Sequence, residues 1–270
     1  MGVRIPSGVQ KRKNMNTIIL QKGQIFNSLH YGQFEILEEI KENIEIKNYN
    51  TQIFKIKFLE TGTEKEVSWQ DIRKGSVQDY NYKNEFGVCK GEGNYDSLNN
   101  PYYQRWNQII HRCYDKKYNK YSSYGGKGVK VCEDWKNFQN FAKWIEEKNN
   151  YNKIDDFAVD KDIIANINHL EIKIYSPETC LLIPHNINGF LAGDSVTCGV
   201  SKTRKKWRAN LSYEGQKYDL GLFENWKDAK IAYANKKQEC WEDLLRKSII
   251  SKELKEILLQ YDFSWHWLWK

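Results

Sequence analysis

The stretch GVSKTRKKWRANLSYEGQKYDLGLF, residues 199–223, decides the fold of the C-terminal part of this chain. Its middle run alternates, so Trp207, Ala209 and Leu211 fall on one face of an extended strand, because successive strand side chains point to opposite faces. The polar positions of the other face are Lys206, Arg208, Asn210 and Ser212. The pattern predicts a sheet with one apolar face and one polar, basic face.

A further extended run lies on each side of this middle run, and Gly215 marks the second turn. The side chains expected to point to the apolar face are Tyr218, Leu220 and Leu222. Those expected on the polar face are Ser201, Thr203, Lys217 and Asp219. Residues 225–247 follow with a helical period. The whole predicts a three-stranded antiparallel sheet backed by one helix.

The polar face has the chemistry that reads double-stranded DNA. A ribbon of strands fits the major groove, where an arginine such as Arg208 contacts guanine with two hydrogen bonds and Asn210 contacts adenine. The residues predicted to contact DNA are Thr203, Arg204, Lys205, Lys206, Arg208, Asn210 and Lys217. The alternative is a solvated face, which antiparallel sheets often have, but Asp219 is the only acidic group expected there.

Residues 199–239 resemble the ethylene-response-factor (Apetala-type) DNA-binding domain. The likeness rests on the opening Gly-Val, the Lys-Trp of the central strand, the Leu-Gly-x-Phe ending, and the alanines and tyrosine of the following helix. It implies a sheet laid in the major groove. The first strand departs from the family, because Ser201 and Thr203 replace its arginines and the cations move to Arg204 and Lys205.

The centre of the chain resembles phage and bacterial HNH homing endonucleases. The likeness is carried by RCYDKKYNKYSSYGGKGVKVCEDWKNFQNF (112–141), VDKDI (159–163) and IYSPETCLLIPHNIN (174–188), and the N-terminal β-rich region resembles the module that precedes them there. The resemblance implies a ββα element in which a carboxylate and a later Asn or His hold one divalent metal. A histidine beside the carboxylate activates water, and a middle Asn orients that histidine.

Two of these four roles are filled. Asp160 matches the carboxylate and Asn188 the final ligand, so the resemblance implies Mg²⁺ or Mn²⁺ at these two residues. Lys161 and Thr179 stand at the positions of the base and of the middle Asn, and a protonated lysine accepts no proton. His185 or His169 is a candidate replacement base.

We therefore expect a DNA-binding protein with a degenerate nuclease site. The first alternative is an active metal-dependent endonuclease, for which the candidate catalytic residues are Asp160, Asn188 and His185. The second is a structural or protein-binding module without a DNA function. In the degenerate site that we expect, Asp160 and Asp162 are turn carboxylates and His185 is a surface residue.

Three cysteines of this region, Cys113, Cys132 and Cys180, together with His111 have the ligand types of a structural zinc site. No C-x-x-C spacing is present, so ordinary buried thiols are the alternative interpretation.

Composition favours an anionic partner, since the net charge is +7 and the sequence pI is about 8.9. No apolar run approaches the roughly 18 residues that span a bilayer, and no signal peptide is recognisable. The scattered cysteines are typical of reduced thiols. We expect a protein in the cytoplasm of a bacterial cell or phage-infected host, with no membrane or small-molecule partner.

The predicted fold class is α+β. Residues 1–18 are expected to be a disordered tail, with Met15 as a second candidate start. A small β-barrel-like module is predicted at 19–85 from FEILEEI, IEIKNY, QIFKIKFLET and KEVSWQDIRKG. An HNH-like module is predicted at 98–192, with helical stretches over 102–114 and 137–149 and a helix beginning at Ser176-Pro177. The ethylene-response-factor-like domain spans 196–240, followed by a helix and an aromatic tail at 241–270.

Overall fold

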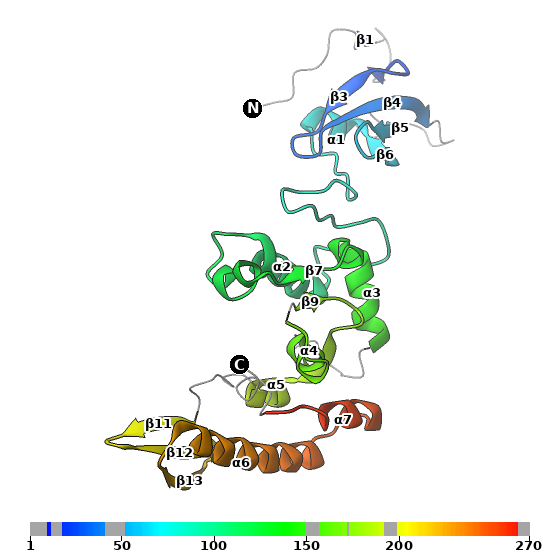
Figure 1. Ribbon diagram of the computed structural model, residues 1–270. Coiled ribbons are helices and arrows are strands. Elements are labelled where there is room, and N and C mark those ends of the chain that lie inside the picture. Colours follow the sequence, from blue (N-terminus) through cyan, green and yellow to red (C-terminus); the bar gives the residue numbers. More distant parts are fainter. Residues whose placement is uncertain are drawn as a thin grey trace. The chain divides into compact units, whose positions relative to one another are not determined.

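The computed structural model describes residues 10–11, 18–40, 52–148, 157–171, 173–191 and 199–263. Its elements are a mixture of helices and mainly antiparallel strands, which confirms the α+β class (Figure 1). The contacts divide the chain into two units, Met1–Asn99 with Lys136–Gln139, and Asn100–Trp135 with Asn140–Lys270. Among the described helices, none combines the length and apolar character that a bilayer crossing needs.

The first unit contains a four-stranded antiparallel meander. Its strands are β3 (Ile25–Asn27), β4 (Gln33–Ile40), β5 (Ile53–Phe58) and β6 (Glu64–Ser68), in that order across the sheet. Alternate side chains of β4 and β5 are buried, as the sequence alternation predicts. A separate pair joins β1 (Gln10–Lys11) to β2 (Ile18–Ile19). The predicted run IEIKNY lies outside the described residues.

The prediction of a strand through WQDIRKG is wrong, because β6 ends at Ser68 and a helix follows. Helix α1 (Trp69–Lys74) starts where Ser68 accepts a hydrogen bond from the amide of Asp71, and it ends at Gly75, whose φ is +67°. Trp69 and Ile72 are buried and pack in the same hydrophobic core as the sheet. The caps at Ser68 and Gly75 therefore favour a helix in this segment, although its composition is typical of a strand.

The second unit begins with helix α2 (Pro101–Tyr114), which agrees with the helical period of the sequence. The 3₁₀ turns η2 (Tyr121–Ser123), η3 (Gly125–Lys127) and η4 (Asp134–Lys136) follow. Strand β7 (Lys130–Val131) pairs in parallel with β9 (Ile174–Tyr175). Helix α3 (Phe138–Lys148) matches the second predicted helix.

A ββα element follows. Strand β8 (Phe157–Asp160) pairs antiparallel with β10 (Leu181–Pro184), and α5 (His185–Leu191) continues directly from β10. The short helix α4 (Asp162–Ile167), which the sequence analysis missed, lies between the strands in sequence. The prediction of a helix beginning at Ser176-Pro177 is wrong. Ser176 Oγ accepts a hydrogen bond from the amide of Thr179, but only one turn forms before β10 begins.

The C-terminal sheet contains β11 (Val200–Thr203), β12 (Lys206–Tyr213) and β13 (Gln216–Phe223), all antiparallel, and lies against α6 (Trp226–Lys247) (Figure 1). Helix α7 (Lys252–Leu258) follows. Helix α6 serves two cores, because Ala229 and Tyr233 pack on the sheet while Trp241 and Leu245 pack with β8, β10 and α5. The predicted aromatic tail after Phe263 lies outside the described residues.

Candidate functional site

The two faces of the β11–β12–β13 sheet differ as the alternation predicts. Ala209 and Leu211 are buried against α6, and Trp207 packs beside them. The alternate side chains of β12 on the opposite, free face are exposed: Lys206, Arg208, Asn210 and Ser212. The strand parity that underlies the predicted DNA-binding face is therefore present in the structure.

The prediction that Leu222 lies on the apolar face is wrong. The register shifts between Ala209 and Asn210, so Ala209 lies opposite Gly221 and Asn210 lies opposite Asp219. This β-bulge inserts one residue and reverses the side-chain alternation beyond it. Leu222 consequently lies opposite Arg208 and is 55% exposed on the free face.

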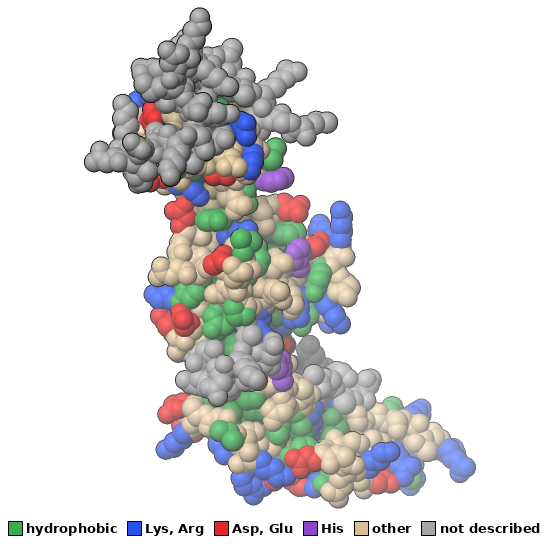
Figure 2. All heavy atoms as spheres, turned by 180° about the vertical axis from the view of Figure 1, so that it is seen from behind, with side chains coloured by type: hydrophobic (Ala, Val, Ile, Leu, Met, Phe, Trp, Pro, Cys, Tyr) green, Lys and Arg blue, Asp and Glu red, His purple; other side chains and the backbone are tan. Residues whose placement is uncertain are grey.

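All the residues predicted to contact DNA are exposed, and they come from the strands and the tip of one hairpin. Arg204 and Lys205 form the turn between β11 and β12, where Arg204 has a φ of +57°. Those on the strands of the free face are Thr203, Lys206, Arg208, Asn210 and Lys217. Figure 2 shows Lys and Arg side chains at the projecting end of the sheet, with acidic side chains close to other cations.

Two of the cations on this face have acidic partners. Arg208 contacts both carboxylate oxygens of Asp219, at 2.5 and 3.3 Å, and Lys206 Nζ lies 2.6 Å from Glu224. The Arg208 guanidinium, through its hydrogen bonds, holds the pKa of Asp219 below its ordinary value. Exposed ion pairs contribute little free energy, so a phosphate can replace either carboxylate. The prediction that Asp219 is the only acidic group at this face is therefore wrong, because Glu224 also lies beside it.

The candidate catalytic residues Asp160, His185 and Asn188 line one cavity of about 280 Å³ within the second unit. The other residues that line it are Arg105, Gln108, Ile109, Arg112, Tyr124, Ala158, Val159, Lys161, Asp162 and Tyr175. The ββα element makes this possible, because Asp160 ends β8 while His185 and Asn188 lie on α5, which continues from the paired strand. His169 is exposed on the turn after α4 and is not among the lining residues.

Asp160 is engaged with the backbone. Its Oδ1 accepts hydrogen bonds from the amides of Asp162 and Ile163, both at 2.8 Å, and these bonds fix the start of α4. The residue is only 9% exposed. Burial, followed by the neighbouring Asp162 carboxylate, raises the pKa of Asp160.

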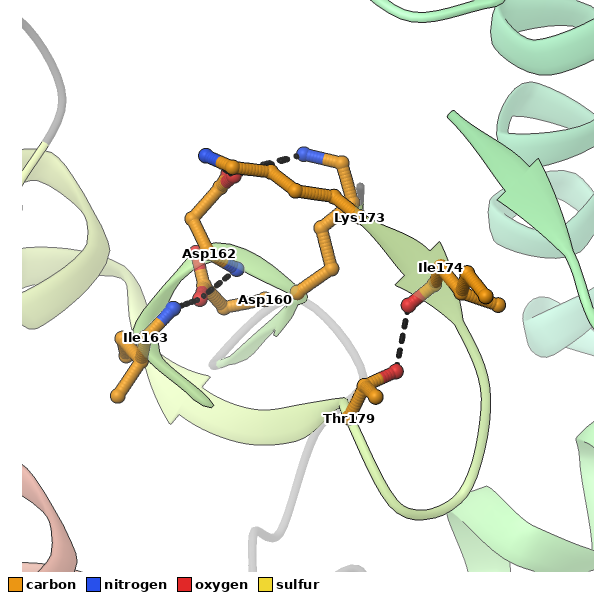
Figure 3. A network of polar contacts seen from close by, with 7 residues as sticks. Asp160, Asp162, Ile163, Lys173, Ile174 and Thr179 are labelled. Atoms are coloured by element: carbon orange, nitrogen blue, oxygen red, sulfur yellow. Dashed lines mark hydrogen bonds and ion pairs between the residues drawn. The ribbon is translucent and has the colours of Figure 1, made fainter. Parts of the chain in front are cut away.

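Lys161 is held in an ion-pair network with Asp162, and Figure 3 shows the contact of Asp162 with Lys173. Lys161 Nζ lies 3.0 and 2.9 Å from the two oxygens of Asp162, which also contacts Lys173 Nζ at 2.5 Å. Although burial favours the neutral acid, these two ammonium groups hold the pKa of Asp162 below its ordinary value. Lys161 also lies 4.7 Å from the ring centroid of Tyr124.

Thr179 does not orient the side chain of Lys161. Its hydroxyl donates to the carbonyl oxygen of Ile174, 2.5 Å away (Figure 3), and lies 3.0 Å from Ser176 Oγ. Thr179 therefore stabilises the loop between β9 and β10.

The predicted zinc set is not assembled. Among the described residues, no group of three or more His, Cys, Asp or Glu side chains is placed to hold a metal. His111 Nδ1 contacts Asp115 at 2.9 Å. Cys113 and Cys180 are buried, and burial raises the pKa of both thiols, that of Cys113 to about 12. Both favour the protonated thiol, as in the interpretation of ordinary buried cysteines.

The arginines that helix α2 contributes to the cavity were not predicted from the sequence. Arg105, Gln108, Ile109 and Arg112 all come from α2. Their spacing of three, four and seven residues puts them on one helix face, and this signal was available in the sequence. The sequence did not show that β8 pairs with β10. That pairing places the ββα element against this face of α2.

No family model, curated protein or solved structure matches this chain.

Proposed function

We propose that this protein binds double-stranded DNA through the free face of the β11–β12–β13 sheet and belongs to the HNH type of mobile-element protein, without an intact nuclease site. The observation that carries the proposal is the separation of side chains on β12: apolar groups pack on α6 and the basic groups are exposed on the other face. The cations Arg204, Lys205 and Lys217 form no ion pair with a described residue, so they are available to phosphates.

The arrangement divides the work between phosphate and base contacts. The turn residues Arg204 and Lys205, with Lys206 and Lys217, suit the DNA backbone, which carries most of the affinity. Arg208 and Asn210 lie on the middle strand, where a sheet in the major groove presents side chains to base edges. Leu222, beside Arg208, adds an apolar group of the kind that contacts a thymine methyl.

Binding is tested by fluorescence anisotropy with a labelled duplex over a range of salt concentrations. Lys206→Gln is expected to weaken binding to every sequence and to reduce the salt slope by about 0.9. Arg208→Gln is expected to weaken binding about 5- to 100-fold at one base position only. Lys227→Gln, on the helix that covers the opposite face, is the charge-matched control. Equal effects of Lys206→Gln and Lys227→Gln would show that the sheet is not the docking face.

An active endonuclease is the second candidate, because one cavity brings Asp160, His185 and Asn188 together. Against it stand the ion-paired Lys161 and the loop-bound Thr179. Incubation of supercoiled plasmid with the protein and Mg²⁺ or Mn²⁺ separates the two functions. We expect no nicking above that of Asp160→Ala; nicking by the wild-type chain that this variant abolishes would favour the endonuclease.

A further inference from the structure

The cavity of the ββα element has a charge that is opposite to what a metal site requires. A divalent cation held there would rely on Asp160 and Asn188, and Mg²⁺ prefers several oxygen ligands. One Asp160 oxygen already accepts two amide hydrogens, and the Asp162 carboxylate is committed to Lys161 and Lys173. This donor set is a poor fit to a divalent metal.

Cationic side chains dominate the lining instead. Arg105, Arg112 and Lys161 all line the cavity, while Asp160 is the only lining carboxylate that no lysine neutralises. The carboxylate of Asp162 is already paired with Lys161 and Lys173. The balance of the cavity walls therefore favours an anion.

The guanidinium of Arg112 is the observation that indicates a ligand. Its Nε is buried without a hydrogen-bond partner, and the guanidinium forms no ion pair with a described residue. Its carbon Cζ lies 5.5 Å from the ring centroid of Tyr124, within the range of a cation–π contact. A buried donor without a partner is costly, and an arginine fork presents two N–H groups in the geometry that a phosphate accepts.

We propose that this cavity is a metal-independent phosphate site, in which Arg112 and Arg105 bind one phosphate group and Asn188 and His185 complete its lining. A volume of about 280 Å³ is smaller than the sites that take drug-sized ligands, which suits a single phosphate with part of a sugar. The phosphate comes from the backbone of bound DNA or from solution. Only the first source rests on the proposed DNA-binding function.

The first arm of the test measures inorganic phosphate binding by titration calorimetry in excess EDTA. Wild-type protein is expected to bind without added metal, and Arg112→Gln to bind about ten- to hundred-fold more weakly. Arg112→Lys, which keeps the charge but not the fork, is expected to lie between the two. Arg246→Gln, an exposed arginine paired with Asp243, is the control and should bind like wild type.

Asp160→Asn separates an anion site from a metal site. Asparagine keeps the oxygen that accepts the two amide hydrogens, so the start of α4 is preserved. Removing the carboxylate charge is expected to tighten phosphate binding about two- to ten-fold. Loss of binding in this variant, a requirement for Mg²⁺, or no phosphate binding by the wild-type chain would each overturn the proposal.

The second arm identifies the source of the phosphate by duplex anisotropy. A salt slope that Arg112→Gln reduces by about 0.9 identifies a DNA backbone phosphate. An unchanged slope together with lost phosphate binding identifies free phosphate and leaves the anion site supported. Failure of the sheet-based DNA-binding proposal is distinct, since it is seen as a lack of effect of Lys206→Gln on duplex affinity.

Discussion

Replacing Asp219 by asparagine is expected to strengthen DNA binding. In the free protein Asp219 occupies both sides of the Arg208 fork, with contacts of 2.5 and 3.3 Å, and it carries a negative charge on the face that we assign to DNA. The substitution frees the fork and removes one repulsion with phosphates. Because both side chains are exposed and the pair is screened, we expect a gain of about two- to ten-fold in affinity at low salt.

The measurement is duplex affinity as a function of salt concentration. The gain should shrink as salt rises, because salt screens the repulsion between Asp219 and the phosphates. The matched control is Glu239→Gln, which makes the same charge change on α6, where Glu239 pairs with Lys236. An Asp219→Asn variant that binds no better than this control would refute the assignment of the free face to DNA.

Four further variants are expected to change stability. Gly199→Ala should destabilise by about 2–5 kcal/mol in urea unfolding, because its φ is +72° and an added Cβ would lie 1.9 Å from the ring of Tyr233. Gly215→Ala, with a φ of +78° and open space, should cost only about 1–2 kcal/mol. Burial raises the pKa of Asp160 in the folded state, so the wild-type free energy of unfolding falls as pH rises from the unfolded pKa through the folded pKa. Asp160→Asn removes this loss, so its free energy of unfolding should exceed that of the wild type most at neutral pH and least in acid. Trp241→Ala should cost about 3–5 kcal/mol, because this fully buried ring joins α6 to the ββα core, and circular dichroism over a thermal scan measures the loss.

The local elements were largely predictable from the sequence, because period and turn chemistry act over short distances. Strand parity placed Ala209 and Leu211 toward the helix, and helical spacing predicted the helix that carries Trp106 and Ile110. The errors have local physical causes as well. The Ser68 and Gly75 caps turned a β-like run into α1, and one extra residue in β13 reversed Leu222.

The candidate site was predictable only in part. The resemblance to HNH proteins singled out Asp160, Asn188 and His185, and the structure does bring these three side chains to one cavity. The sequence near them did not indicate that Lys161 pairs with Asp162 or that Arg112 lines the same cavity. The placement of Arg112 near Asp160 depends on contacts between residues about 50 positions apart. The Lys161–Asp162 pair joins neighbours in the sequence, but Lys173, which completes it, is brought there by the fold.

By itself the sequence determined most of the strands and helices and which face of the last sheet is basic, since these properties follow from periodicity along a single element. Helices α1 and α4 and the position of Leu222 were not determined in this way. The tertiary structure alone decided the charge balance of the cavity. That balance is a sum over side chains from α2, β8, α4 and α5, and electrostatic interactions depend on distance in space rather than on distance along the chain.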